Sequence, residues 1–337
     1  MAKGKFLINT LKKSDEKDGI TLVCTFSRKI FVPFFFQAFR QLILPPEPIH
    51  LIIYDNTDDE TLKDALMKEV NPLEVPCMSQ FASVRFYKSY LKGHGNIMGS
   101  GNEQFRKSKL WNIWRMWLSM KRMIKTPEMF VLEDDTICQP DAFLRLLGLL
   151  RKNSKVGFVT AIETGRFSNP WLPVRLGVHH MKMKGQKILA RHSLSPDTKG
   201  VVPIDAAGVY CFAAKTKAYL DGFDGYNPIS LKVPFFALDN VLTWNIKQHG
   251  WKVLADFSQW CSHLQATPTR IIAFSHDQAV QMSDIWIKEC NNYAHGVEVL
   301  SRHHRARKFR VKKIAPSWEL EPSEKCTSTN ASTAASL

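Results

Sequence analysis

The sequence predicts an α/β fold in which a mostly parallel sheet is flanked by helices. Short, continuous apolar runs alternate along the chain with segments of helical periodicity. The strongest of these runs contain no charged side chain, as expected for strands that helices cover on both faces. The chain has 337 residues, of which 45% are hydrophobic and 23% are charged. These totals are typical of a globular protein that is large enough to bury a core.

The first half of the chain is expected to alternate between strands and helices. The expected strands are residues 19–25, 49–54, 83–87 and 129–132. The expected helices are residues 34–44, 60–70 and 103–125, with a loop at 93–101 before the last of them. Pro45 and Pro46 end the first helix, because proline cannot continue it.

The second half is less regular. Helices are expected at residues 140–151 and 240–249, where Pro140 opens the first and Gly250 ends the second. Strands are expected at 156–160 and 251–255, with a strand-like segment at 201–214 around Gly208. Residues 163–200 are rich in Gly, Pro, His and Lys, a composition that predicts loops.

Three tryptophans, Trp111, Trp114 and Trp117, share helical spacing with Leu110 and Leu118. This spacing favours a helix face that packs on the sheet. A stacking platform for sugars or bases is the alternative interpretation.

The net charge is the most informative feature of the composition. The chain has 46 Lys and Arg against 31 Asp and Glu, a net charge of +15, and residues 302–313 alone carry seven basic side chains. A positive field of this kind attracts polyanions. The alternative is a generally basic surface that binds no polymer. The polar N-terminal residues predict that there is no signal peptide, and the most apolar run, residues 30–39, is too short to span a bilayer. We therefore expect a soluble, cytoplasmic protein (host cytoplasm if it is viral) with no transmembrane segment.

Its seven cysteines form no CxxC pair, which favours free thiols over a zinc cluster.

Three consecutive acids, Glu133, Asp134 and Asp135, directly follow the expected strand at 129–132. In an extended segment Glu133 and Asp135 point to the same side, at the sheet edge where open α/β sheets bind ligands. Two such carboxylates suit Mg²⁺ or Mn²⁺, which would also neutralise a diphosphate leaving group. The alternative is that these acids merely cap the helix expected from Pro140.

Several motifs in this order resemble the metal-dependent glycosyltransferases of the GT-A fold, especially the large family-2-like group. The acidic "FVLEDDT" resembles their D-x-D motif, with a carboxylate retained at each end. The other matching segments are "LVCTFSRK", "LIIYDNTDD", "GSGNEQFRKSKLWN", "IDAAGVYCFAAKTKAYLDGFD", "ALDNVLTWNIKQHG" and "WCSHL". The family's helix motif usually reads Glu-Asp, whereas this chain has Leu238-Asp239.

The resemblance implies a GT-A catalytic domain over residues 19–265 with a Rossmann-like sheet. Its nucleotide-binding half would be 19–136 and its acceptor half 137–265. Outside it we expect a loose N-terminal segment at 1–18, a helical extension at 266–300, and a tail at 301–337 that is first basic and then disordered.

The resemblance also implies roles for individual residues. Asp135, Glu133 and His263 would hold the metal, with His276 as a weaker substitute for His263, and Asp239 would be the general base of an inverting transfer. The donor would contact Thr25, Asp55, Arg106, Glu133, Asp134 and Gly208, with Lys109 as an alternative to Arg106. The alternatives to these functional roles are that His263 is an ordinary core histidine and that Asp239 is a helix N-cap.

The predicted function is thus transfer of a hexose or pentose from a nucleotide-diphosphate sugar, possibly a UDP-sugar, to a hydroxyl. The basic charge suggests hydroxylated bases in DNA as the acceptor, as in some viral and protist enzymes. A cell-surface or lipid-linked glycan at an anionic membrane, with peripheral membrane contact, is the alternative. A metal-dependent nuclease or phosphatase and a non-catalytic binding protein are the other classes, although such hydrolases usually draw several acids and histidines onto two metals.

Overall fold

The computed structural model describes eleven stretches of the chain, and all structural statements below concern these residues. They are 5–8, 17–57, 59–70, 80–88, 113–163, 177–184, 187–194, 198–225, 238–266, 271–273 and 318–319.

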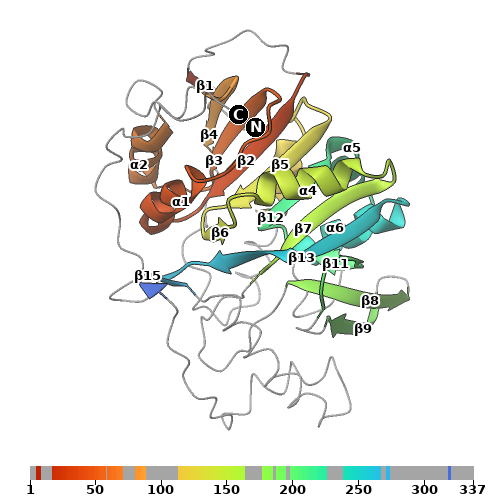
Figure 1. Cartoon of the computed structure of the whole chain (residues 1–337). Coiled ribbons are helices and arrows are strands. Elements are labelled where there is room, and N and C mark those ends of the chain that lie inside the picture. Colours follow the sequence, from red (N-terminus) through yellow and green to blue (C-terminus); the bar gives the residue numbers. More distant parts are fainter. Residues whose placement is uncertain are drawn as a thin grey trace, which may run out of the picture.

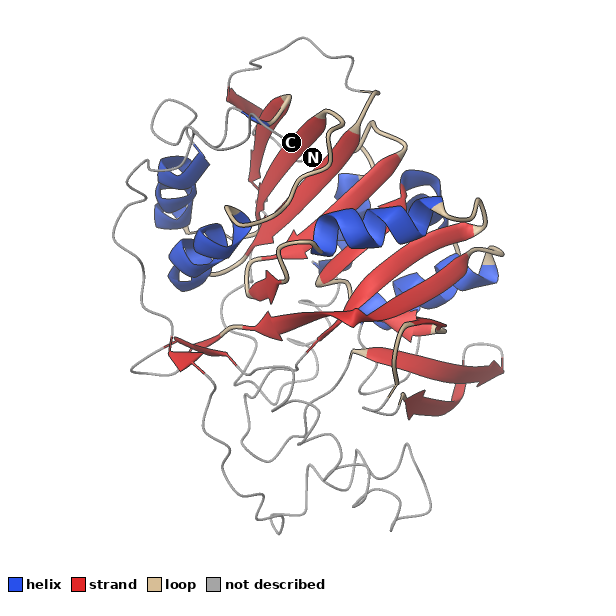
Figure 2. Cartoon of the chain, viewed as in Figure 1, coloured by secondary structure: helices blue, strands red, loops and turns tan. Residues whose placement is uncertain are grey.

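A twisted, ten-stranded sheet forms the centre of the molecule (Figure 2). Its strands lie in the order β1-β4-β3-β2-β5-β12-β7-β13-β10, and β6 pairs with β13 beside this path. In chain order these strands are β1 (Lys5–Ile8), β2 (Ile20–Phe26), β3 (Ile49–Asp55), β4 (Ser83–Lys88), β5 (Glu128–Glu133), β6 (Thr136–Cys138), β7 (Val156–Glu163), β10 (Val201–Pro203), β12 (Cys211–Lys215) and β13 (Lys252–His263).

Helices cover both faces of this sheet, as the apolar runs predicted. They are α1 (Val32–Phe39), preceded by the 3₁₀ turn η1 (Lys29–Phe31), α2 (Glu60–Val70), α4 (Ala142–Arg151), α5 (Thr216–Asp221), α6 (Leu238–Gln248) and a helical segment at 113–120. Figure 1 shows α1, α2 and α4 on the near face and α5 and α6 behind the sheet. Successive residues of β2 point to opposite faces, so Leu22 packs in the α1 and α4 core and Val23 in the core of Trp117 and Leu242.

The four strands predicted in the first half are confirmed to within two residues at each end. They form the parallel block β4-β3-β2-β5, in which Phe26 is aligned with Asp55 and Thr25 with Glu133. The carboxyl ends of β2, β3 and β5 therefore meet at one edge of the sheet. Trp114 and Trp117 are buried in the core, as predicted, whereas Trp111 and the predicted loop at 93–101 lie outside the described residues.

The prediction of a mostly parallel sheet holds only in part for the rest of the chain. Strands β7 and β13 pair parallel, but β12 runs antiparallel to both β5 and β7, and β1, β6 and β10 also pair antiparallel. The chain enters β12 at the carboxyl edge of β5, where Tyr210 O accepts a hydrogen bond from Glu133 N, so β12 runs back toward the opposite edge.

Several element boundaries also differ from the predictions. Helix α1 is shifted toward the N-terminus because Pro33 fits the first helical turn, where its missing N–H costs nothing. Residues 163–200 are not all loop: β8 (Val178–Lys184) and β9 (Lys187–Ser193) form a hairpin that pairs with β11 (Ala206–Ala207). The helix expected at 103–125 ends at residue 120 in the described part. Strand β13 continues to His263, with a register shift against β7 between Asp256 and Trp260.

The described part of the C-terminal region is β structure. Strands β14 (Gln265–Ala266), β15 (Ile271–Ala273) and β16 (Trp318–Glu319) form a small sheet, so the expected helical extension is wrong at Ile271–Ala273. The basic run at 302–313 lies outside the described residues. In the described part of the chain, we find no helix that combines the length and the apolar character needed to cross a membrane.

Candidate functional site

The acidic turn, Glu133-Asp134-Asp135, connects β5 to β6 at the carboxyl edge of the parallel block. Three backbone hydrogen bonds tie it to three other segments. Asp134 N donates to Thr25 O at the end of β2 (3.0 Å), Glu133 N to Tyr210 O before β12 (2.9 Å), and Leu264 N after β13 to Asp135 O (2.6 Å). The turn is therefore held between the ends of strands that are far apart in the sequence.

Glu133 and Asp135 meet His263 at this turn. One ligand atom from each side chain lies within 4.8 Å of the other two. Asp135 and His263 are buried and Glu133 is half-buried. His263 arrives there because it is the last residue of β13 and pairs with Thr136, directly after the acidic turn. The structure thus brings together the three residues that the sequence predicted as metal ligands.

This donor set fits a divalent cation. Two carboxylate oxygens suit a hard ion such as Mg²⁺ or Mn²⁺, and the imidazole nitrogen favours a transition metal over Mg²⁺. The set offers three protein ligands and would leave further positions of an octahedral ion for other oxygens. A divalent ion that accepts both oxygen and nitrogen ligands matches all three donors.

Glu163 orients His263 and was missed by the sequence analysis. Its Oε2 lies 3.3 Å from His263 Nδ1, and it is the last residue of β7, next to β13 in the sheet. A carboxylate beside a ligating imidazole is a common arrangement at metal sites, where it limits the orientation of the ring. The ring of Tyr210 stands edge-on to the imidazole with the ring centres 5.5 Å apart, and its hydroxyl donates to Ala161 O at 2.7 Å. No local motif marks Glu163, because only the pairing of β7 with β13 brings it here.

Asp134 faces away from this group. Its carboxylate accepts hydrogen bonds from the backbone N–H groups of Ser27 (2.7 Å) and Arg28 (2.8 Å) and from the Ser27 hydroxyl (3.2 Å). Burial raises the pKa of Asp134 above its usual value, although the Arg28 guanidinium opposes this shift. These contacts make Asp134 a brace for the loop after β2, and the structure does not place it with the predicted metal ligands.

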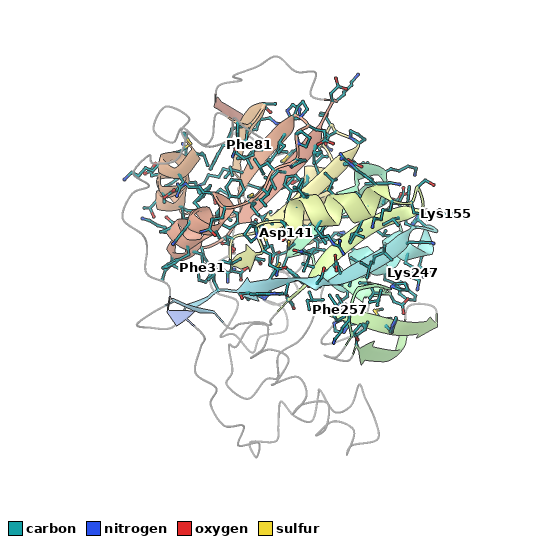
Figure 3. The ribbon with its side chains drawn as sticks, viewed as in Figure 1. Phe31, Phe81, Asp141, Lys155, Lys247 and Phe257 are labelled. Carbon is teal, nitrogen blue, oxygen red and sulfur yellow. The ribbon has the colours of Figure 1, made fainter. Side chains whose placement is uncertain are left out.

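Helix α1 fixes the same loop from the other side. Its aromatic residues Phe35 and Phe36 pack on Phe26, the last residue of β2, with ring centres 4.8 and 5.6 Å apart. Phe31 of η1, labelled in Figure 3, packs with Ile137, which follows the acidic turn in β6, and with Leu264, whose N–H donates to Asp135 O. The loop that carries Ser27 and Arg28 is therefore held against the turn by apolar contacts.

Thr25 and Asp55 lie at the predicted edge, but Asp55 is fully buried. Its carboxylate accepts hydrogen bonds from Thr57 N (2.9 Å) and the Thr57 hydroxyl (2.8 Å), and Lys88 Nζ is 3.4 Å away. Burial raises the pKa of Asp55, while Thr57 and Lys88 oppose that shift. In this structure Asp55 contacts protein groups, so a contact with a nucleotide base stays a prediction. Thr25 is aligned with Glu133 across the β2–β5 pair.

Gly208 and Asp239 are close together. Gly208 lies in the turn between β11 and β12, and its N–H donates to Gly177 O at 2.8 Å. A Cβ added at Gly208 would stand 2.3 Å from the Tyr210 ring and 3.5 Å from an oxygen of the Asp239 carboxylate. Only glycine fits here without displacing Tyr210. Asp239 is in the first turn of α6, where a carboxylate also interacts favourably with the helix dipole.

Thr243 joins these two elements and was also missed by the sequence analysis. It lies one helical turn after Asp239 and is completely buried. Its hydroxyl accepts a hydrogen bond from Ala207 N (2.9 Å) and donates to the carbonyl of Asp239 (3.0 Å). The position of Asp239 relative to Gly208 therefore depends on this hydroxyl.

Thr243→Val is expected to lower the free energy of unfolding by about 1–3 kcal/mol. The valine keeps the shape but leaves the buried Ala207 N–H without an acceptor. Thr243→Ser keeps the hydroxyl and should cost about 1 kcal/mol, the value of one buried methyl group. Urea denaturation of the two variants measures the difference. A valine variant as stable as the serine variant would show that the hydroxyl contributes nothing.

Three residues with predicted roles lie outside the described residues. They are Arg106, Lys109 and His276.

Comparisons with known proteins give little further information. No protein-family model matches the chain, and no curated protein matches it in sequence. Among solved structures, a mannosyltransferase from Pyrobaculum calidifontis in complex with GDP-Man and Mn²⁺ is similar to this chain with a TM-score of 0.44 and 10% sequence identity. The similarity covers 75% of this chain and 59% of that protein, less than two thirds of its length. A similarity this distant carries no argument about the activity of this chain.

Proposed function

We propose that this protein is a metal-dependent glycosyltransferase that takes a sugar from a nucleotide-diphosphate donor. The observation that carries the proposal is the group of Glu133, Asp135 and His263 at the carboxyl ends of the parallel strands. Open α/β sheets bind ligands at this edge. The same three residues belong to the motifs that resemble GT-A glycosyltransferases.

In this proposal each residue has a defined task. Glu133, Asp135 and His263 hold a divalent cation, which when bound neutralises the negative charge of the diphosphate leaving group. Glu163, 3.3 Å from His263 Nδ1, limits the orientation of the imidazole. An Oδ oxygen of Asp239 takes the proton from the attacking hydroxyl of the acceptor, as the general base of an inverting transfer. Gly208 allows the Tyr210 ring and the Asp239 carboxylate to approach the backbone closely, because a Cβ there would stand 2.3 Å from the ring and 3.5 Å from an Asp239 oxygen.

The direct test is release of nucleoside diphosphate from a panel of UDP- and GDP-sugars with Mn²⁺ or Mg²⁺. We expect turnover of at least one donor with Mn²⁺ and loss of that turnover on chelation. A protein that binds no donor and turns over none would contradict the proposal. Cleavage of a phosphodiester or release of inorganic phosphate would instead indicate a metal-dependent nuclease or phosphatase.

For the acceptor we propose DNA with hydroxylated bases, on the basis of the net charge of +15 and the basic run at 302–313. Adding such DNA to the donor panel should convert slow hydrolysis into transfer. A glycan at an anionic membrane is the competing acceptor. Transfer to vesicle-borne glycolipid but not to DNA would favour it.

Neutralising the basic run is expected to weaken DNA binding and to flatten its dependence on salt. Each lost phosphate contact should reduce the slope of log K against log salt by about 0.9. The residues to replace are Arg305, Arg307, Lys308, Arg310, Lys312 and Lys313. Titration of both proteins with duplex DNA at several salt concentrations gives the slopes. Equal slopes would mean that this run does not contact phosphates, and donor hydrolysis without acceptor serves as the control that should not change.

A further inference from the structure

Arg28 reaches from the loop after β2 into the acidic turn. Its Nη2 lies 2.6 Å from Asp135 Oδ2 and 3.0 Å from Asp134 Oδ1, and its backbone N–H donates to Asp134 Oδ2 at 2.8 Å. The guanidinium also lies over the ring of Phe31, 4.6 Å from its centre. About a third of the side chain, 35%, is exposed. A permanent positive charge is therefore in contact with one of the residues proposed to bind the metal.

We propose that Arg28 is a built-in counter-cation that competes with the divalent metal for Asp135 and, once displaced, binds the anionic part of the donor. The competition concerns only the metal and this chain. The second half rests on the proposed function, because it requires a phosphate-bearing donor at this edge of the sheet.

The charges at the acidic turn favour competition between Arg28 and a divalent cation. Glu133, Asp134 and Asp135 are three acids in a row, and two of them are buried. Burying such charges is costly unless they are paired, and Arg28 supplies one full positive charge to two of them. Arginine stays protonated at every accessible pH, so it cannot relieve the conflict by losing a proton. A divalent cation that binds Asp135 must therefore replace or repel this guanidinium.

If a metal ion binds Asp135, the Arg28 guanidinium can remain paired with Asp134. Asp134 holds the backbone of residue 28 as well as Nη2, and it is not among the three grouped ligands. The ion pairs of Arg28 use only Nη2, and its buried Nε makes no hydrogen bond with the described residues. A guanidinium tethered in this way keeps N–H donors for phosphate oxygens, which arginine binds in a bidentate manner. The same side chain can thus exchange one anion for another.

The test is Mn²⁺ binding to Arg28→Met without donor, measured by isothermal titration calorimetry. Methionine is unbranched like the arginine stem but has no charge. We expect Mn²⁺ to bind about tenfold more tightly than to the wild type, because a nearby positive charge has been removed. Donor binding at saturating Mn²⁺ should become about tenfold weaker, because the charged hydrogen bonds to phosphate are lost.

Two further variants make the result specific. Arg145→Met removes another guanidinium of a buried carboxylate, that of Asp256 at 2.9 Å, and should leave Mn²⁺ affinity unchanged. Arg28→Lys keeps the charge but not the bidentate geometry. It should bind Mn²⁺ like the wild type and donor more weakly, and it serves if the methionine variant does not fold.

Each outcome separates the competition from the proposed function. Unchanged or weaker Mn²⁺ binding in Arg28→Met, with an intact fold, overturns the competition. The same is true if neither the wild type nor Arg28→Met binds Mn²⁺ or Mg²⁺, or if the lysine variant binds Mn²⁺ much more tightly than the wild type. Tighter Mn²⁺ binding in a protein that binds no nucleotide sugar would support the competition and contradict the proposed function.

Discussion

Asp135→Asn is expected to abolish turnover of the sugar donor, with a loss of about 10³-fold or more. The substitution keeps the size of the side chain but removes the charge that would hold the metal, a contribution of several kcal/mol to charge stabilisation in the transition state. Asp135 lies at the end of a strand and is fully buried, and Glu133 and His263 remain in place beside it. We therefore expect the remaining donor set to bind Mn²⁺ much more weakly.

The measurement combines nucleoside diphosphate release with Mn²⁺ titration of the same variant. Asp224→Asn is the control, because Asp224 is an exposed acid far from the acidic turn. It lines a surface hollow together with Glu128. Glu128 is the first residue of β5 and therefore lies at the opposite edge of the sheet. The Asp224→Asn protein should turn over donor and bind Mn²⁺ like the wild type. An Asp135→Asn protein with normal Mn²⁺-dependent turnover would end the glycosyltransferase proposal. Far-UV circular dichroism of the Asp135→Asn protein checks that the fold is intact, so that a loss of turnover can be assigned to the missing charge.

Asp239→Asn is expected to reduce transfer to the acceptor by about 10²–10⁴-fold, the usual contribution of a general base. Donor affinity should stay near the wild-type value, because Asp239 is not among the three grouped ligands. Loss of the charge in the first turn of α6 should cost only about 0.3–1 kcal/mol of stability.

Two readouts distinguish a base from a helix-stabilising residue. The transfer rate at saturating donor reports the proton transfer, and urea denaturation reports the helix. A variant with slightly reduced stability and an unchanged transfer rate would reduce Asp239 to a residue that only stabilises α6. Thr243→Ser, which keeps the hydroxyl under Asp239, should transfer at close to the wild-type rate.

The parallel half of the sheet and the position of its acidic end were predictable from local patterns in the sequence. Strands β2, β3, β4 and β5 are short apolar or β-rich runs between helical segments, and such patterns are local. Because parallel strands present their carboxyl ends at one edge, the location of Thr25, Asp55 and Glu133 there followed from the same pattern. The burial of Trp114 and Trp117 was likewise predictable from helical spacing.

The way in which the second half of the chain completes the site depends on contacts between segments that are distant in the sequence. The direction of β12 depends on a turn, and the hairpin β8–β9 has a composition that is typical of loops. His263 was proposed from resemblance, but its neighbours follow from the register of β13 with β6 and β7, which brings Thr136 and Glu163 beside it. Arg28 pairs with the acidic turn for the same reason. These contacts join segments about a hundred residues or more apart, and their formation depends on strand register and loop packing, which the local periodicity of a sequence does not encode.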